Sequence, residues 1–131
     1  YKNIDSLIIN ENELRHEMRD KVGNLIKMGT KLIKFLNIKK LTVTQGNKGA
    51  VLIEKNGKSI NSPAFANKVV DKVGAGDAML AMISLGTKIK MKSDLVLFLG
   101  SLAGASAVES IGNSEYLNKN QLLRQIQFSI K

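Results

Sequence analysis

An amphipathic segment, Asn24 to Leu36, stands between two short runs of strand-forming residues. Those runs, Leu7 to Ile9 and Leu41 to Thr44, both predict buried strands. The apolar side chains of the segment between them recur at helical spacing: Leu25, Met28, Leu32, Phe35 and Leu36. Lysines occupy its other faces. The spacing therefore predicts a helix that lays this apolar face, Phe35 included, on one side of a sheet.

The remaining segments extend the same pattern. The pair Asn56-Gly57 is typical of a type I′ turn between two antiparallel strands. We expect a polar helix around Glu11 to Lys21, strands at Ala50 to Glu54, Lys58 to Asn61 and Val69-Val70, a helix carrying Ala78, Met82 and Leu85, and helices over Asp94 to Ser110 and Lys119 to Ser129. This order of elements predicts the α/β class, with helices covering the strands of a sheet.

Length and composition set outer limits on the fold. The 131 residues, 44% of them hydrophobic and 24% charged, fit one domain (1–131) and exclude collagen-like and wholly disordered chains. The absence of cysteine excludes a disulfide scaffold and leaves the single histidine, His16, without partners for a metal site. No signal-peptide pattern opens the chain, so we expect a cytoplasmic protein. Because the chain begins with Tyr1 and reaches a strand almost at once, we expect a piece of a longer protein or a processed chain.

The formal net charge of +9 makes an anionic partner worth considering. The lysines are spread along the chain, however, and only 5% of the residues are aromatic, which supplies few side chains for stacking on bases. A solvated lysine surface explains the charge better than nucleic acid, which stays as an alternative. The longest apolar stretch, Leu95 to Val108, is shorter than the roughly 20 residues of a membrane-spanning helix. Its small residues would let a helix lie close against a sheet.

Gly74-Ala75-Gly76-Asp77, at the start of a predicted helix, is the segment best suited to chemistry. A glycine-rich turn there leaves backbone N–H groups unpaired where the helix dipole is positive. Because the segment has little side-chain bulk, a phosphate can approach this backbone. Asp77, in the first turn, is placed to accept a proton from a hydroxyl that attacks phosphorus. The structural alternative is a simple glycine turn with an ordinary first-turn Asp.

Two further motifs follow predicted strands. Thr44-x-Gly46-x-x-Gly49 allows a turn with positive φ that opens its backbone to a ligand, or a plain β-turn. Asn10-x-x-Glu13 matches a capping pair at a helix N-terminus. Its amide and carboxylate are also suited to hold water around a magnesium ion.

The order and context of these three motifs resemble the C-terminal half of the PfkB, or ribokinase-like, carbohydrate kinase family. That family's pattern is N-x-x-E at a strand end, then T-x-G-x-x-G, then D-T-x-G-A-G-D at the start of a helix. The matching residues are Asn10 and Glu13, then Thr44, Gly46 and Gly49, then Asp71 with Gly74, Ala75, Gly76 and Asp77. The resemblance covers nearly the whole chain and is greatest to the heptose kinase domain of ADP-heptose synthases.

The resemblance implies a fold and a reaction. The fold is the C-terminal, nucleotide-binding part of a three-layer α/β/α kinase domain. The reaction is phosphoryl transfer from ATP to a hydroxyl of a sugar or sugar phosphate. Asp77 would be the catalytic base, and the backbone of Gly74, Ala75 and Gly76 would form the anion hole for the transferred phosphoryl group.

The resemblance also implies the binding residues. Asn10 and Glu13 would organise Mg²⁺ and the phosphates of ATP, and Asp71 with Val73 falls where some relatives bind a monovalent cation such as K⁺. The nucleotide pocket would be lined by Thr44, Gly46, Gly49, the helix bearing Gly100 and the turn at Gly112.

The chain departs from the family pattern at two positions. Lys72 replaces the Thr that usually follows the first Asp, and Gly100 stands where the family often has an Asn near the adenine. A degenerate kinase domain that serves as a nucleotide-binding or scaffold module is therefore the alternative function. The family's N-terminal, sugar-binding half has no counterpart in this sequence. We therefore expect the chain alone to lack turnover, and its exposed sheet edge to favour a homodimer.

Overall fold

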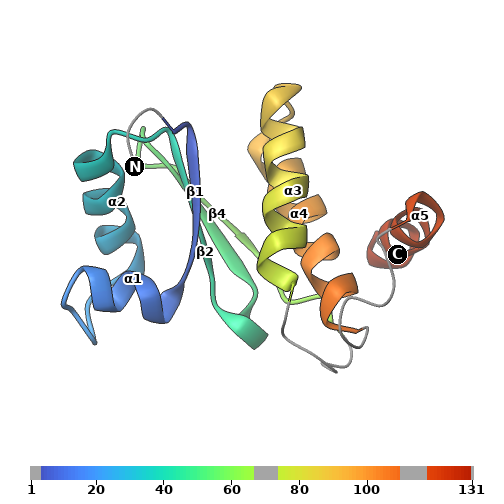
Figure 1. Ribbon diagram of the computed structural model, residues 1–131, viewed down its shortest axis with the longest axis horizontal. Coiled ribbons are helices and arrows are strands. Elements are labelled where there is room, and N and C mark those ends of the chain that lie inside the picture. Colours follow the sequence, from blue (N-terminus) through green and yellow to red (C-terminus); the bar gives the residue numbers. More distant parts are fainter. Residues whose placement is uncertain (1–3, 67–73, 110–117, 131) are drawn as a thin grey trace. The chain divides into compact units, whose positions relative to one another are not determined.

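The computed structural model describes residues 4–66, 74–109 and 118–130 (Figure 1). The chain divides into two compact units, Tyr1–Pro63 and Ala64–Lys131. Among the described residues, the first unit contains a mixed sheet with helices and the second contains helices. The α/β class predicted from the sequence is confirmed. The strand predicted at Val69-Val70 lies outside the described residues.

The first unit is built on a sheet whose strands follow the order β1-β2-β3-β4. Its strands are β1 (Ser6–Asn10), β2 (Lys40–Thr44), β3 (Ala50–Glu54) and β4 (Ser59–Ser62). β1 and β2 run parallel with Asn10 opposite Thr44, while the other neighbouring pairs are antiparallel. Because a parallel pair needs a crossover connection, the helices of this unit come between β1 and β2 in the chain.

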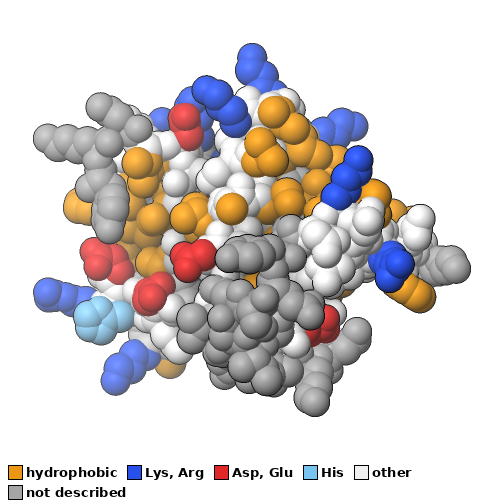
Figure 2. Space-filling view, turned by 45° about the vertical axis from the view of Figure 1, so that its right-hand side comes forward, with side chains coloured by type: hydrophobic (Ala, Val, Ile, Leu, Met, Phe, Trp, Pro, Cys, Tyr) orange, Lys and Arg blue, Asp and Glu red, His pale blue; other side chains and the backbone are white. Residues whose placement is uncertain are grey.

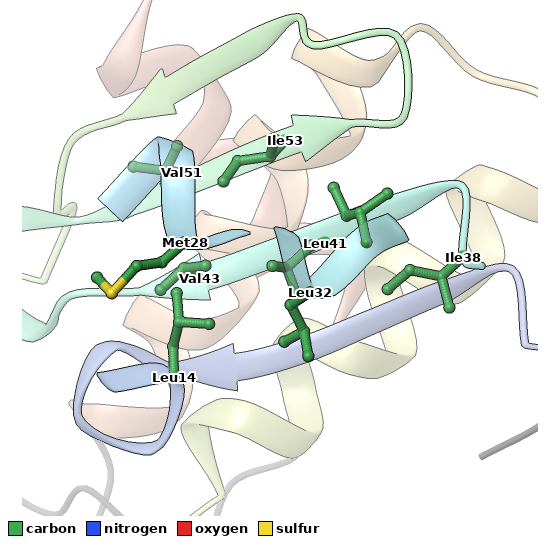
Figure 3. Packing of buried hydrophobic residues seen from close by; sticks show 9 residues of the cluster. Leu14, Met28, Leu32, Ile38, Leu41, Val43, Val51 and Ile53 are labelled. Carbon is green, nitrogen blue, oxygen red and sulfur yellow. The ribbon is translucent and has the colours of Figure 1, made fainter. Parts of the chain in front are cut away.

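These two helices, α1 (Glu11–Glu17) and α2 (Leu25–Leu36), cover one face of the sheet (Figure 1). Their buried side chains pack on those of the strands (Figure 3). The core consists of Leu14, Met28, Leu32, Ile33, Ile38, Leu41, Val43, Val51 and Ile53. α2 comes close to the sheet at Gly29, where a Cβ would lie 2.3 Å from Cδ1 of Ile53. The amphipathic helix predicted from the sequence therefore packs on a sheet, as expected.

Phe35 does not belong to this buried face, and its predicted place there is wrong. Its side chain is 82% exposed, whereas Ile33 is 1% exposed. The reason is that Phe35 lies one helical turn after Lys31, which is also exposed, so the two side chains share the outward face.

One predicted helix boundary also differs from the structure. α1 ends at Glu17 instead of Lys21, because Arg19 adopts a left-handed conformation with φ of 50° and the carboxylate of Asp20 accepts a hydrogen bond from the N–H of Gly23 at 2.7 Å. Both features belong to a turn and not to a continuing helix.

The β3–β4 hairpin does not use the predicted type I′ turn. That turn needs positive φ at both central residues, and here Gly57 has φ of 90° while Asn56 has a negative value. The N–H of Gly57 donates to the carbonyl of Glu54 at 2.9 Å, and the N–H of Glu54 donates to the carbonyl of Lys58 at 2.8 Å. These bonds close a loop over Lys55 to Gly57, longer than the predicted turn.

The second unit contains α3 (Ala75–Lys88), α4 (Ser93–Val108) and α5 (Lys119–Ser129). α3 and α4 lie side by side (Figure 1). A Cβ on Gly100 of α4 would lie 2.7 Å from Cγ1 of Ile83 of α3, so this small residue lets the two helices lie close together within this unit. In the part of the chain that the structure describes, no helix is both long and apolar enough to span a bilayer.

Candidate functional site

Asn10 ends β1 and is also the N-cap of α1. Its side-chain oxygen Oδ1 accepts a hydrogen bond from the N–H of Glu13 at 2.9 Å, and its own N–H donates to Oε2 of Glu13 at 2.9 Å. The capping pair predicted from the sequence is therefore confirmed. Both residues are exposed, and the second oxygen of Glu13, Oε1, takes no part in this capping box.

The parallel register brings the second motif to the same edge of the sheet. Thr44 ends β2 directly opposite Asn10. A short 3₁₀ helix, η1 (Gly46–Lys48), follows, with positive φ at Gly46 (59°) and at Gly49 (91°). A Cβ on Gly46 would meet nothing within 4 Å. The glycines thus form a turn with positive φ beside the residues that start α1, which both alternatives left open by the sequence allow.

A side-chain contact between these two motifs was not predicted. Nε2 of Gln45 donates a hydrogen bond to Oε2 of Glu11 at 2.8 Å, and Nε and Nη2 of Arg15 donate to Oε1 of Glu11 at 2.9 and 2.7 Å. The bond from Gln45, and then the bonds and positive charge of Arg15 and the charge of Lys48, hold the pKa of Glu11 below its ordinary value.

Strand register is the signal that could have revealed this contact. Glu11 and Gln45 each come one residue after the facing pair Asn10 and Thr44, at the carboxyl ends of two parallel strands. Residues at that edge of a parallel pair are the ones that face a common crevice. The sequence reasoning used the motif positions and passed over the residues between them.

The glycine-rich motif begins α3 in the second unit. Gly74 is the N-cap with φ of 84°, and the first helical hydrogen bond runs from the N–H of Ala78 to the carbonyl of Gly74 at 2.9 Å. The N–H groups of Ala75, Gly76 and Asp77 precede it and have no acceptor among the described residues. Gly76 is exposed, and a Cβ there would meet nothing within 4 Å. This is an open row of donors at the positive end of a helix.

Asp77 lies in the first turn of α3, and its side chain is exposed. Within the described ranges of the chain, no hydrogen bond or ion pair engages its carboxylate. A carboxylate left in this state next to open backbone amides can accept a proton from a group bound there.

The structure also places Gly100 and His16, two residues considered in the sequence analysis. Gly100 is buried, and its contact with Ile83 gives the glycine a packing role of its own. His16 lies at the surface, as expected, and is the pale blue residue of Figure 2. Among the residues with described positions, no group of three or more acidic, histidine or cysteine side chains could hold a metal ion. The remaining predicted residues, Asp71, Lys72, Val73 and Gly112, lie outside the described residues.

Comparison with known proteins decides the family. The family model described as pfkB family carbohydrate kinase matches residues 1–120. The chain belongs to this family. Among curated proteins, the bifunctional protein HldE of Koribacter versatilis is 33% identical over 95 residues, which are 72% of this chain and 19% of that protein. The family predicted from the three motifs is therefore confirmed.

Solved structures show the same fold. Ribokinase of Arabidopsis thaliana complexed with ribose and ATP superimposes with a TM-score of 0.83 at 24% identity, over 97% of this chain and 42% of that one. Phosphofructokinase-2 of Escherichia coli in complex with potassium gives a TM-score of 0.84 at 19% identity, over 99% of this chain and 42% of that one. The chain has a partial ribokinase-like fold and spans less than half the length of these relatives.

Proposed function

We propose that this chain is the C-terminal, nucleotide-binding part of an ATP-dependent sugar kinase. The reaction would transfer the terminal phosphoryl group of ATP to a hydroxyl of a sugar or sugar phosphate. Membership of the pfkB carbohydrate kinase family supports the reaction class. The observation that carries the proposal is the row of amides at the start of α3 with the carboxylate of Asp77 beside it, none of which has a hydrogen-bond partner among the described residues.

The backbone of Gly74, Ala75 and Gly76 would hold the transferred phosphoryl group. Unpaired N–H groups at a helix N-terminus stabilise negative charge, and the charge on the phosphoryl oxygens is greatest during transfer. The open space at Gly76 supports this role, because a Cβ there would meet no described atom within 4 Å.

Asp77 would act as the general base. Its carboxylate would accept the proton of the sugar hydroxyl as the new bond forms between that oxygen and the γ-phosphorus. At the same time the bond from the γ-phosphorus to the bridging oxygen breaks, and ADP leaves with that electron pair. Exposure of Asp77 on the described surface is consistent with access by an acceptor sugar.

The nucleotide side would be formed by the turn from Thr44 to Gly49, with Gly100 further along the chain. Mg²⁺ would bind at Asn10 and Glu13 indirectly, through water. The capping box leaves only Oε1 of Glu13 outside its hydrogen bonds, and Mg²⁺ keeps several waters while it binds ATP phosphates. The ion would neutralise charge on the phosphates. A K⁺ site at Asp71 and Val73 is supported by the family pattern and by the potassium in the related phosphofructokinase-2.

Calorimetric titration with Mg-ATP tests the anion hole. Gly76→Val should reduce the affinity at least tenfold, because its side chain fills the open volume above the amides. Ala81→Val is the matched control, since it adds similar bulk at an exposed position of the same helix. Equal affinities of Gly76→Val and the parent would contradict the proposed anion hole.

A degenerate kinase that binds nucleotide as a scaffold or sensor is the second candidate, motivated by Lys72 and Gly100. Turnover of ATP by the longer protein with a sugar phosphate, lost in Asp77→Asn, would favour the kinase. ATP binding without turnover would favour the scaffold.

From the family resemblance, a heptose phosphate is the acceptor to try first. A cytoplasmic location and a homodimer complete the proposal, and sedimentation over a range of concentrations tests the latter.

A further inference from the structure

We infer that Glu11 is a positioning residue that fixes the turn from Gln45 to Gly49 against the start of α1. In this role Glu11 itself touches no ligand and acts through Gln45. The effect on ligand binding rests on the proposed function, since it supposes that this turn faces the nucleotide. The structural part of the inference stands on the contacts of the first unit alone.

The carboxylate of Glu11 is held from two sides. Its Oε2 accepts from Nε2 of Gln45 at 2.8 Å, while its Oε1 accepts two hydrogen bonds from Arg15. Arg15 is itself fixed, because its Nη1 donates to the carbonyl of Gly23 at 3.1 Å. The side chains of Arg15 and Glu11 are 23% and 22% exposed, so this ion pair is better shielded than an ordinary surface pair. Glu11 therefore reaches Gln45 from a fixed position.

The turn needs such an attachment because it has little packing of its own. Gly46, Asn47 and Lys48 are all exposed, and a Cβ on Gly46 would contact nothing within 4 Å. The backbone of Gln45 closes the turn, since its N–H donates a hydrogen bond to the carbonyl of Gly49 at 2.8 Å. The side chain of Gln45 thus connects the closure of the turn to α1.

The contact is also long-range. Glu11 and Gln45 are 34 positions apart in the chain, yet each comes one residue after a strand of the parallel pair. The Glu11–Gln45 bond therefore sets the distance between the two predicted nucleotide-side motifs, Asn10-x-x-Glu13 and Thr44-x-Gly46-x-x-Gly49. Backbone pairing between β1 and β2 ends at Asn10 and Thr44, so beyond that point the side-chain bond maintains the alignment.

Amide hydrogen exchange on the 131-residue chain tests the structural part. Glu11→Ala and Gln45→Glu should each raise the exchange rate of the amides of Gln45 and Gly49 about fivefold or more, because one removes the acceptor and the other opposes two carboxylates. Exchange within β3 should not change, which shows that the sheet remains folded. Glu17→Ala is the matched control, since it removes an exposed carboxylate from the same helix.

The double variant Glu11→Gln with Gln45→Glu provides the rescue. It restores the hydrogen bond with donor and acceptor reversed, so turn exchange should return toward the parent rate. The dissociation constant for Mg-ATP should rise about threefold to tenfold in the single variants and recover in the double variant. Unchanged turn exchange in Glu11→Ala would overturn the inference. If the parent chain binds no Mg-ATP, the proposed function fails for this chain, while the exchange rates still decide whether Glu11 positions the turn.

Discussion

The carbonyl oxygen of Ala75 lies 3.4 Å from the place where a Cβ on Gly104 would stand. Ala75 is the first residue of α3, and Gly104 is in the second half of α4. Because no side chain larger than a methyl group stands at this position, α4 can lie against the first turn of α3. The glycine-rich segment that precedes Asp77 depends for its position on this neighbouring helix as well as on its own residues.

Substitutions at Gly104 should separate a tolerated contact from a collision. Gly104→Ala should keep or slightly raise stability, because 3.4 Å is an ordinary contact and Ala favours helix over Gly by about 1 kcal/mol. Gly104→Val should lose about 1–3 kcal/mol, because its methyl groups press on the start of α3. Urea unfolding measures the stability of both variants. Equal stabilities of the two variants would contradict the close approach.

The capping box and the proposed Mg²⁺ site can be tested apart. Asn10→Ala should lower the free energy of unfolding by about 1 kcal/mol, because α1 loses its N-cap. Glu13→Gln should change it by less than about 0.5 kcal/mol, because a Gln oxygen can still accept from the N–H of Asn10. It should nevertheless weaken the dependence of ATP binding on Mg²⁺, measured by calorimetry with and without the ion. An unaltered dependence would remove Glu13 from the proposed site.

Exposure predicts opposite outcomes for two residues of α2. Leu32→Ala should cost about 2–5 kcal/mol, because Leu32 is 3% exposed and belongs to the core. Phe35→Gln should change stability by less than about 0.5 kcal/mol and should raise solubility, because the Phe35 ring lies outside the core. Denaturant midpoints compare the two. A loss at Phe35 as large as that at Leu32 would mean that its ring is covered.

Acid should reveal the contacts of Glu11. The hydrogen bond from Gln45 and the pairing with Arg15 hold its pKa below the ordinary value of 4.5, and Lys48 adds a smaller effect of the same sign. A carboxyl whose pKa is lowered by folding stabilises the folded state above its unfolded pKa, and that contribution disappears as the pH falls through the folded value. Stability in metal-free buffer should therefore fall below pH 4.5, and less steeply in Glu11→Gln. Urea unfolding across this range gives both slopes, and identical slopes would contradict the expectation.

Much of the first unit was predictable because its elements obey simple periodicities. The apolar runs predicted the strands of the sheet, and the amphipathic segment predicted from Asn24 corresponds to α2, whose N-cap in the structure is Asn24. The end of α1 was not predictable from periodicity, since it depends on the left-handed conformation of Arg19. The candidate site was likewise predictable only in part. Local motifs located Asn10, Thr44 and Gly74, whereas the bond from Gln45 to Glu11 depends on strand register and side-chain rotamers.

The parallel pairing of β1 with β2 has a consequence for the folding pathway. β2, β3 and β4 follow one another through short turns, whereas β1 must close a loop that contains both α1 and α2. Closing that longer loop costs more entropy, so the antiparallel strands should be paired in the transition state before β1 joins them. Kinetic measurements should find that Val51→Ala slows folding, whereas Ile9→Val mainly speeds unfolding. The pairing of β1 with β2, which includes Asn10 opposite Thr44, would then be the last part of the sheet to form and the first to open.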